Sequence, residues 1–106
     1  MAISRIPTAW IASYSSDGTN MTLPIASFSG LTVAEAATAD GDICNIVKEI
    51  LEVIYAAQQA LASADRPTKM TVARLTTTDD GTGIVTRQFT VTFTCSSPTI
   101  NVAAEA

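Results

Sequence analysis

The feature that most constrains the fold is one long segment with helical periodicity, from residue 43 to about residue 64. At 100° per residue its apolar side chains cover an arc of about 200°. They are Ile43, Cys44, Ile46, Val47, Ile50, Leu51, Val53, Ile54, Tyr55, Ala57 and Leu61. A helix that lies on a single sheet needs an apolar stripe of only a little over 100°.

The surplus apolar surface predicts that this helix also contacts a partner chain. The helix residues that we expect at such a contact are Ile46, Leu51, Val53 and Tyr55. The alternative is that loops and terminal segments of the same chain cover the surplus.

The sequence also marks where this helix begins and ends. Asp40 or Asp42 can accept hydrogen bonds from the free N–H groups of the first turn, and Gly41 separates the helix from the segment before it. The preceding Thr32-Val33-Ala34-Glu35 has the pattern of a capping box and predicts a short helical turn. Pro67 ends the helix beyond Arg66. The charged residues of the polar face are expected in solvent: Lys48, Glu49 and Glu52.

Two clusters of Asp, Gly and Thr, at residues 15–20 and 78–83, predict hairpin turns before and after the helix. The first hairpin would pair residues 9–14, which contain Trp10 and Tyr14, with residues 21–28. Pro24 cannot donate to a strand ladder, so the second of these strands is expected at a sheet edge.

The second hairpin has the clearer strand, because apolar side chains alternate with polar ones, mostly Thr, from residue 84 to residue 95. Its partner is expected at residues 68–78. A two-residue turn at Asp80-Gly81 would place Val72 opposite Phe89 and Arg74 directly opposite Arg87. A shift by one residue buries less apolar surface.

These elements predict a single α+β domain, residues 1–106, with the order ββαββ. The expected architecture is a mostly antiparallel four-stranded sheet with the long helix packed on one face. The chain ends, residues 1–4 and 96–106, are expected to be extended arms that dock on neighbouring molecules.

Composition argues against several classes of function. The chain has 106 residues, a net charge of −4 and no His. It therefore lacks the usual general base and the favoured ligand of zinc, copper and iron, and we expect no enzyme, cofactor or metal site. Its acidic balance disfavours nucleic acid, and no apolar run is long enough for a membrane span. Cys44 and Cys95 have no motif spacing and are expected to be free, buried thiols.

Arg74 and Arg87 form the one polar pair that suggests a binding site. Residues 1–64 carry six acidic and two basic side chains, whereas four of the six basic residues lie between positions 66 and 87. Two guanidinium groups on one hairpin can hold a carboxylate of another chain. The alternative is neutralisation within the chain by Asp79, Asp80 or a helix glutamate.

The whole chain resembles the small virion proteins of tailed bacteriophages, in particular the cement or decoration proteins. The resemblance spreads over the Met1-Ala2-Ile3 lead, the Ala-rich helical residues 53–64, the hydroxyl-rich residues 86–94 and the Ser-Ser-Pro segment that begins at Ser96. It implies a non-enzymatic protein that oligomerises, binds the major capsid protein or another virion protein, and reinforces the head shell.

The resemblance also implies a place on the capsid surface of the virion, after synthesis in the host cytoplasm. No binding residue can be carried over from those proteins, since no diagnostic motif is matched. The alternative hypothesis is a small soluble protein-binding module or inhibitor that meets a host protein through a sheet edge or an acidic surface.

Overall fold

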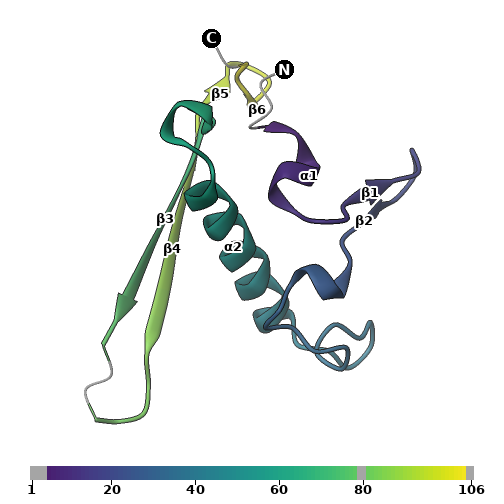
Figure 1. The fold of residues 1–106 in the computed structure, drawn as a ribbon, viewed down its shortest axis with the longest axis vertical. Helices are drawn as coiled ribbons and strands as arrows, with labels where there is room; N and C mark the ends of the chain where they lie inside the picture. Colours follow the sequence, from purple (N-terminus) through teal and green to yellow (C-terminus); the bar gives the residue numbers. More distant parts are fainter. Residues whose placement is uncertain (1–4, 79–80, 105–106) are drawn as a thin grey trace. The chain divides into compact units, whose positions relative to one another are not determined.

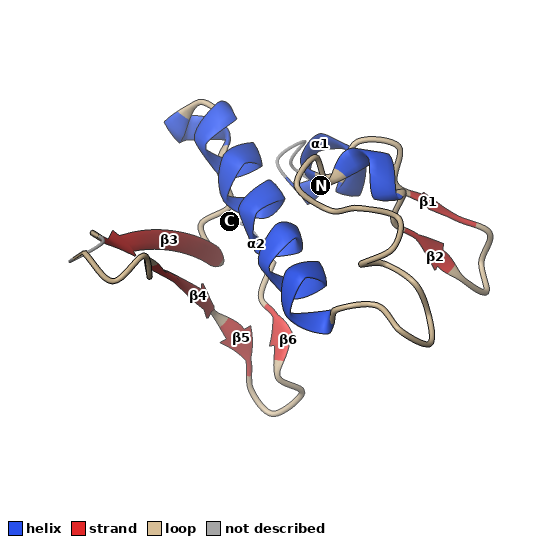
Figure 2. Cartoon of the chain, turned by 90° about the horizontal axis from the view of Figure 1, so that it is seen from below, coloured by secondary structure: helices blue, strands red, loops and turns tan. Residues whose placement is uncertain are grey.

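The computed structural model describes residues 5–78 and 81–104, and it divides the chain into two compact units. The first unit is Met1–Arg66 and the second unit is Pro67–Ala106. Helices and short antiparallel sheets are both present, which confirms the α+β class (Figure 1). In the described residues, three separate two-stranded sheets, β1-β2, β3-β4 and β5-β6, take the place of the predicted four-stranded sheet (Figure 2).

The first unit contains the long helix and several short elements. These are α1 (Pro7–Trp10), β1 (Ser15–Ser16), β2 (Met21–Thr22), the 3-10 turn η2 (Ile25–Ser27), α2 (Ile43–Ala60) and the 3-10 turn η3 (Ser63–Asp65). The short helix α1 lies beside α2.

The first hairpin is correct at its turn and wrong in its strands. The Asp17 carboxylate accepts from the N–H groups of Asn20 at 2.7 Å and Thr19 at 2.8 Å, and Gly18 has φ of +88°. The strands β1 and β2 have only two residues each. Trp10 lies on α1, because Pro7 occupies the first helical turn, where its missing N–H costs nothing.

The helix α2 begins where the sequence indicates. Asp42 is its N-cap, and its carboxylate accepts from the N–H groups of Cys44 at 2.9 Å and Asn45 at 3.4 Å. The helix ends at Ala60, earlier than predicted. After η3 reverses the chain, Arg66 donates from Nε to the Leu61 carbonyl at 3.1 Å and from Nη2 to the Gln59 carbonyl at 3.4 Å. A cation thus satisfies carbonyl groups at the negative end of the helix dipole.

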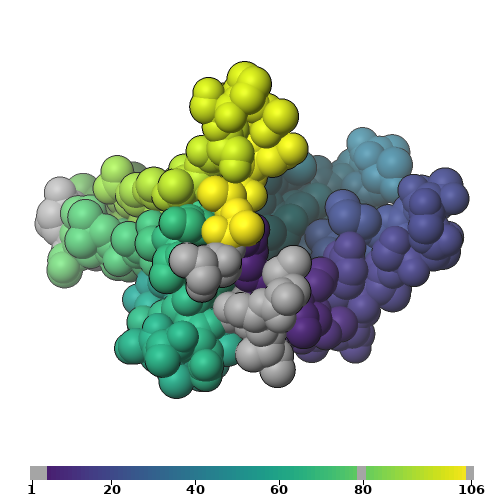
Figure 3. Space-filling model, turned by 90° about the horizontal axis from the view of Figure 1, so that it is seen from above, coloured from purple at the N-terminus to yellow at the C-terminus, as the bar shows by residue number. Residues whose placement is uncertain are grey.

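The second unit consists of two hairpins. The long one pairs β3 (Met70–Thr77) with β4 (Thr86–Phe93), and the short one pairs β5 (Cys95–Ser96) with β6 (Asn101–Val102). The segment from Ser96, predicted to be an extended arm, therefore folds back on itself. Its side chains from residue 95 to residue 102 are exposed, and this segment lies open at the surface in Figure 3.

The register of the long hairpin differs from the predicted one by two residues. Val72 pairs with Val91, Arg74 with Phe89 and Thr76 with Arg87, so neither of the two registers considered from the sequence is present. The connection runs from residue 78 to residue 85 and is longer than a two-residue turn. Gly81 and Gly83 in this connection both have positive φ, at +101° and +79°, a conformation that glycine adopts at little steric cost. Asp79 and Asp80 lie outside the described residues.

Little of either unit is fully buried. Among the apolar side chains that the structure describes, Phe28 in the first unit and Val72 in the second are buried, at 3% and 4% exposure, and Pro67 is the one other buried residue of this kind. No described side chain is less than 2% exposed. A fully buried Val, Leu, Ile or Phe contributes about 1.5–3 kcal/mol, so this chain gains little of that stabilisation from its own interior.

Candidate interaction surfaces

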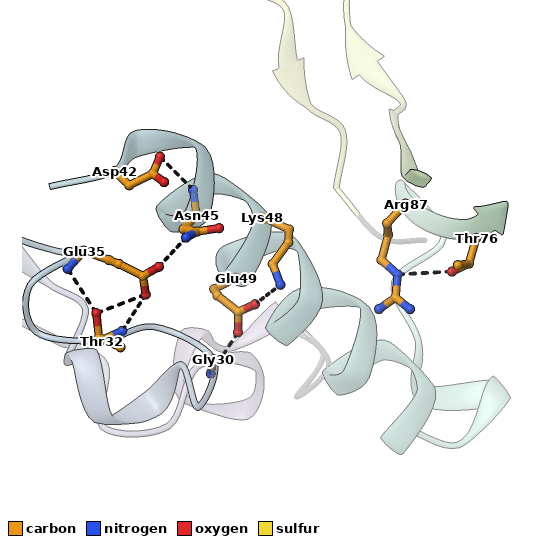
Figure 4. A network of polar contacts seen from close by, with 9 residues as sticks. All are labelled: Gly30, Thr32, Glu35, Asp42, Asn45, Lys48, Glu49, Thr76 and Arg87. Atoms are coloured by element: carbon orange, nitrogen blue, oxygen red, sulfur yellow. Dashed lines mark hydrogen bonds and ion pairs between the residues drawn. The ribbon is translucent and has the colours of Figure 1, made fainter. Parts of the chain in front are cut away.

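The predicted arginine pair lies on one face of the β3-β4 hairpin, but the two residues are not opposite each other. Because alternate residues share a face, Arg74 and Arg87 stand on the same side at diagonal positions. Arg87 donates from Nε to the Thr76 hydroxyl at 3.1 Å (Figure 4), and both arginines are exposed. The predicted direct opposition is wrong because the turn is longer, yet both guanidinium groups remain on one exposed surface.

The same face of the hairpin carries most of its apolar residues, whereas Leu75 lies on the opposite face. Those on the same face as the arginines are Met70, Val72, Phe89, Val91 and Phe93. Val72 is buried, whereas Phe93 at the end of β4 is 51% exposed. The opposite face is exposed throughout and bears mostly hydroxyl groups, as the alternating sequence pattern predicts.

The predicted contact face of α2 is partly covered. Ile46, Leu51, Val53 and Tyr55 are all half-buried. The apolar residues that α2 leaves most open lie in its first two turns, where Ile43 is 67% exposed and Val47 is 48% exposed. The surplus apolar surface inferred from the periodicity is therefore concentrated at the N-terminal end of the helix.

Glu49 is a residue whose environment the sequence did not reveal. It was predicted to lie in solvent, but it is 6% exposed. Its Oε1 accepts from the Gly30 N–H at 3.0 Å and its Oε2 pairs with Lys48 Nζ at 2.5 Å (Figure 4). A Cβ atom at position 30 would overlap the Glu49 carboxylate, so a larger residue there would displace the carboxylate from this position. In the sequence, the isolated Gly30 was the one feature that could have indicated this close approach.

A second polar cluster confirms the predicted capping box. Glu35 Oε1 accepts from the Thr32 N–H at 2.9 Å and from its hydroxyl at 3.1 Å, while the Thr32 hydroxyl accepts from the Glu35 N–H at 3.2 Å. Asn45 of α2 donates to the other oxygen of Glu35 (Figure 4). The Thr32 backbone and hydroxyl bonds, with Asn45 and the nearby Lys48 charge, lower the pKa of the Glu35 carboxyl. The cluster joins the loop to the helix.

The first unit also has an apolar cavity of about 220 Å³. It is lined by Leu23, Ile25, Phe28, Leu31, Ala36, Ile46 and Ile50. The lining has no charged side chain, so the cavity offers no group for acid–base or nucleophilic chemistry.

The cysteines differ from their predicted environment. Cys44 and Cys95 are free thiols, but both are exposed and not buried. Cys44 lies in the first turn of α2, on the open part of its apolar arc, and Cys95 begins β5. The apolar pattern of the sequence predicted that both cysteines are buried. Each one instead lies in a segment that the rest of its unit does not cover.

Residues 5–78 and 81–104 contain no group of three or more Cys, Asp or Glu side chains placed to hold a metal ion. Within the same residues, no helix has the length and apolar character to cross a membrane. Comparison with known proteins gave no match to a family model, to a curated protein or to a solved structure.

Proposed function

We propose that this chain is a non-enzymatic structural protein that works by association, as a cement protein that oligomerises and binds the major capsid protein of a bacteriophage head. The observation that carries the proposal is the small buried interior beside many exposed large apolar side chains. The exposed set is Ile6, Met21, Leu23, Val33, Ile43, Val47, Leu75, Ile84, Val85, Phe93, Ile100 and Val102.

The free energy of burial explains why this pattern favours association. Single exposed apolar residues are ordinary on a monomer, but a small domain normally offsets them with a well-buried core. In this chain the described core residues are Phe28 and Val72. Covering the open residues against other subunits would supply the missing apolar burial, at about 25 cal/mol per Å² before association costs.

Within this proposal, each surface has a role. The exposed first turns of α2, together with Ile46, Leu51, Val53 and Tyr55, contact a subunit of the shell. The Arg74 and Arg87 guanidinium groups hold a carboxylate of the shell, for which two arginines on one exposed face are suited. The whole-chain resemblance to phage cement proteins favours the virion surface as the place of action.

A second candidate function has its own supporting observation. Each described sheet has two strands, so strand edges are available to an extended segment of another protein. This favours a soluble protein-binding module or inhibitor as the alternative. The same experiment separates the two functions.

The test is co-sedimentation of the purified chain with assembled head shells of its phage, alongside sedimentation velocity of the chain at micromolar concentration. We expect self-association and a saturable mass increase on the shells. A chain that stays monomeric and adds no mass to shells contradicts the proposal. Capture of one soluble host protein without shell binding supports the alternative instead.

A matched pair of variants tests the arginine role. Arg74→Ala with Arg87→Ala should weaken shell binding about tenfold or more, because a charged hydrogen-bonded pair contributes about 1.5–3 kcal/mol. Arg74→Lys with Arg87→Lys keeps the charge but loses the planar fork, so intermediate binding is expected. Equal binding by all three proteins would exclude the arginines from the contact.

A further inference from the structure

We propose that β4 of one molecule pairs antiparallel with β4 of a second copy, along the edge of β4 that faces away from β3. Two hairpins then form one continuous four-stranded sheet. This inference names the self-association surface, so it rests on the proposed association of the chain but not on the identity of the shell partner.

The open edge follows from the pattern of the ladder. The β3-β4 sheet has two strands, so β4 has one strand neighbour among the residues that the structure describes. Thr94 directs its N–H to the Lys69 carbonyl at 2.8 Å, on the β3 side. Because the direction of backbone groups alternates along an antiparallel strand, those of Thr92 and Thr90 also face β3. The backbone groups of Phe89 and Val91 therefore point to the open edge.

Nothing in β4 blocks a further strand. Proteins protect free edges with Pro, Lys, inward charges or bulges. Residues 86–93 contain no Pro, Lys or acidic residue, and Arg87 is their one charge. The segment is rich in Thr, Val and Phe, which favour strands. The edge also continues through Thr94 into β5 (Figure 1).

The hairpin also needs a further strand on energetic grounds. A two-stranded ribbon is marginal in water, and three or more strands with an apolar face are needed for independent stability. The long hairpin has eight residues in each strand and one buried apolar side chain, Val72. A second copy of the hairpin supplies two more strands and extends the apolar face.

The sequence of β4 is complementary to itself in the antiparallel sense. With the two-fold axis beside Thr90, Phe89 meets Val91 of the second copy, and their outward backbone groups exchange hydrogen bonds. Arg87 lies opposite Phe93 of the second copy, where a guanidinium can stack on an aromatic ring that is 51% exposed. Thr90 faces Thr90. No arginine stands opposite an arginine in this register.

The net charges of the two units favour contact between copies through the second unit. The first unit has seven acidic and three basic residues, a net charge of −4, so two copies of it repel each other. The second unit has three acidic and three basic residues and is neutral. Self-association through the second unit therefore avoids the repulsion that contact between two first units would bring.

Two lysine variants form the main test. Thr90→Lys places two ammonium groups directly opposite each other at the two-fold axis, whereas Thr71→Lys places the same charge on the same exposed hairpin face but on β3. Sedimentation velocity should show that Thr90→Lys raises the dimer dissociation constant about tenfold or more, since like charges placed opposite each other oppose pairing. Thr71→Lys should leave it within about twofold.

A cross-linking experiment tests the geometry independently of stability. In a background with Cys44→Ser and Cys95→Ser, Thr90→Cys should form a disulfide between copies under mild oxidation, because facing Cβ atoms lie about 4.5–5.5 Å apart. Thr71→Cys should not, because three strand spacings of about 4.8 Å separate its two copies.

The outcomes separate this inference from the proposed function. The β4 pairing is overturned if the wild type and both lysine variants associate equally and Thr90→Cys forms no cross-link. The proposed association of the chain would still stand in that case. A wild-type chain that is monomeric at about 100 µM also overturns the pairing, and shell co-sedimentation then decides the proposed function alone.

Discussion

In the first unit, side chains satisfy the backbone groups at the ends of segments, whereas in the second unit backbone pairs mainly with backbone. Asp17, Thr32 with Glu35, Asp42 and Arg66 each bond main-chain groups within the first unit. In the second unit the long β3-β4 ladder provides most of the order.

This difference bears on which unit would gain more from contact with another chain. Caps and loop contacts are local, so the first unit specifies its own turns and helix ends. A ladder of two strands leaves both an edge and a face to be covered. We therefore expect the second unit to gain more stability from association than the first.

The largest effect should come from the buried aromatic residue of the first unit. Phe28→Ala removes a side chain that is 3% exposed, and should lower the free energy of unfolding by about 3–5 kcal/mol. Urea unfolding followed by the circular dichroism of α2 measures this loss. Phe93→Ala, at 51% exposure, is the matched control and should cost less than about 1 kcal/mol at concentrations where the chain is monomeric. Equal losses of unfolding free energy in Phe28→Ala and Phe93→Ala would contradict the expected difference between the two units.

A smaller effect is expected at the C-terminal end of α2. Arg66→Ala removes the donor to the Leu61 and Gln59 carbonyls and should destabilise the first unit by about 1–2 kcal/mol. Arg66→Lys keeps the charge near the helix dipole but not the paired donors, so it should restore about half of the lost stability. Thermal unfolding by circular dichroism compares the three proteins, and an unchanged midpoint for Arg66→Ala would show that the cap adds no stability.

The smallest effect is a dependence on pH. The Thr32 bonds hold the pKa of Glu35 below its ordinary value of 4.5, so its carboxylate stabilises the folded state above that value. This contribution is lost as pH falls through the lowered pKa of the folded state. Glu35→Gln should therefore be less stable than the wild type near neutral pH, and the difference should shrink as the pH falls below 4.5 and through the lowered pKa.

Urea midpoints at several pH values measure this difference for Glu35→Gln. Asp40→Asn, at an exposed position, is the control and should follow the wild type throughout. If the urea midpoint of Glu35→Gln stays below that of the wild type by the same amount at low pH, the effect does not come from the carboxylate charge.

Signals encoded by neighbouring residues predicted the structure well. The N-cap at Asp42, the capping box of Thr32 and Glu35, and the turn at Asp17 and Gly18 are all present. Each depends on side chains within about four residues of the backbone groups that they bond. The pairing of β3 with β4 was also predicted, because alternation of apolar and polar residues persists over eight positions.

The features that depend on distant contacts were not predicted. Glu49 has a polar helix position in the sequence, yet it is buried and bonds to the N–H group of Gly30, nineteen residues away. The hairpin register depended on the length of the connection that contains Gly81 and Gly83, and a change of two residues keeps every side chain on its face. The sequence pattern therefore identified the face that bears Arg74 and Arg87 but not their neighbours across the ladder.

The exposed thiols have a practical consequence. Cys44 belongs to the first unit and Cys95 to the second, and the chain has no other cysteine. A maleimide dye or nitroxide attached to each native sulfur would give every unit its own spectroscopic reporter without a designed substitution. Heating such labelled protein would then reveal whether the helical part and the hairpin part melt in one step or in two.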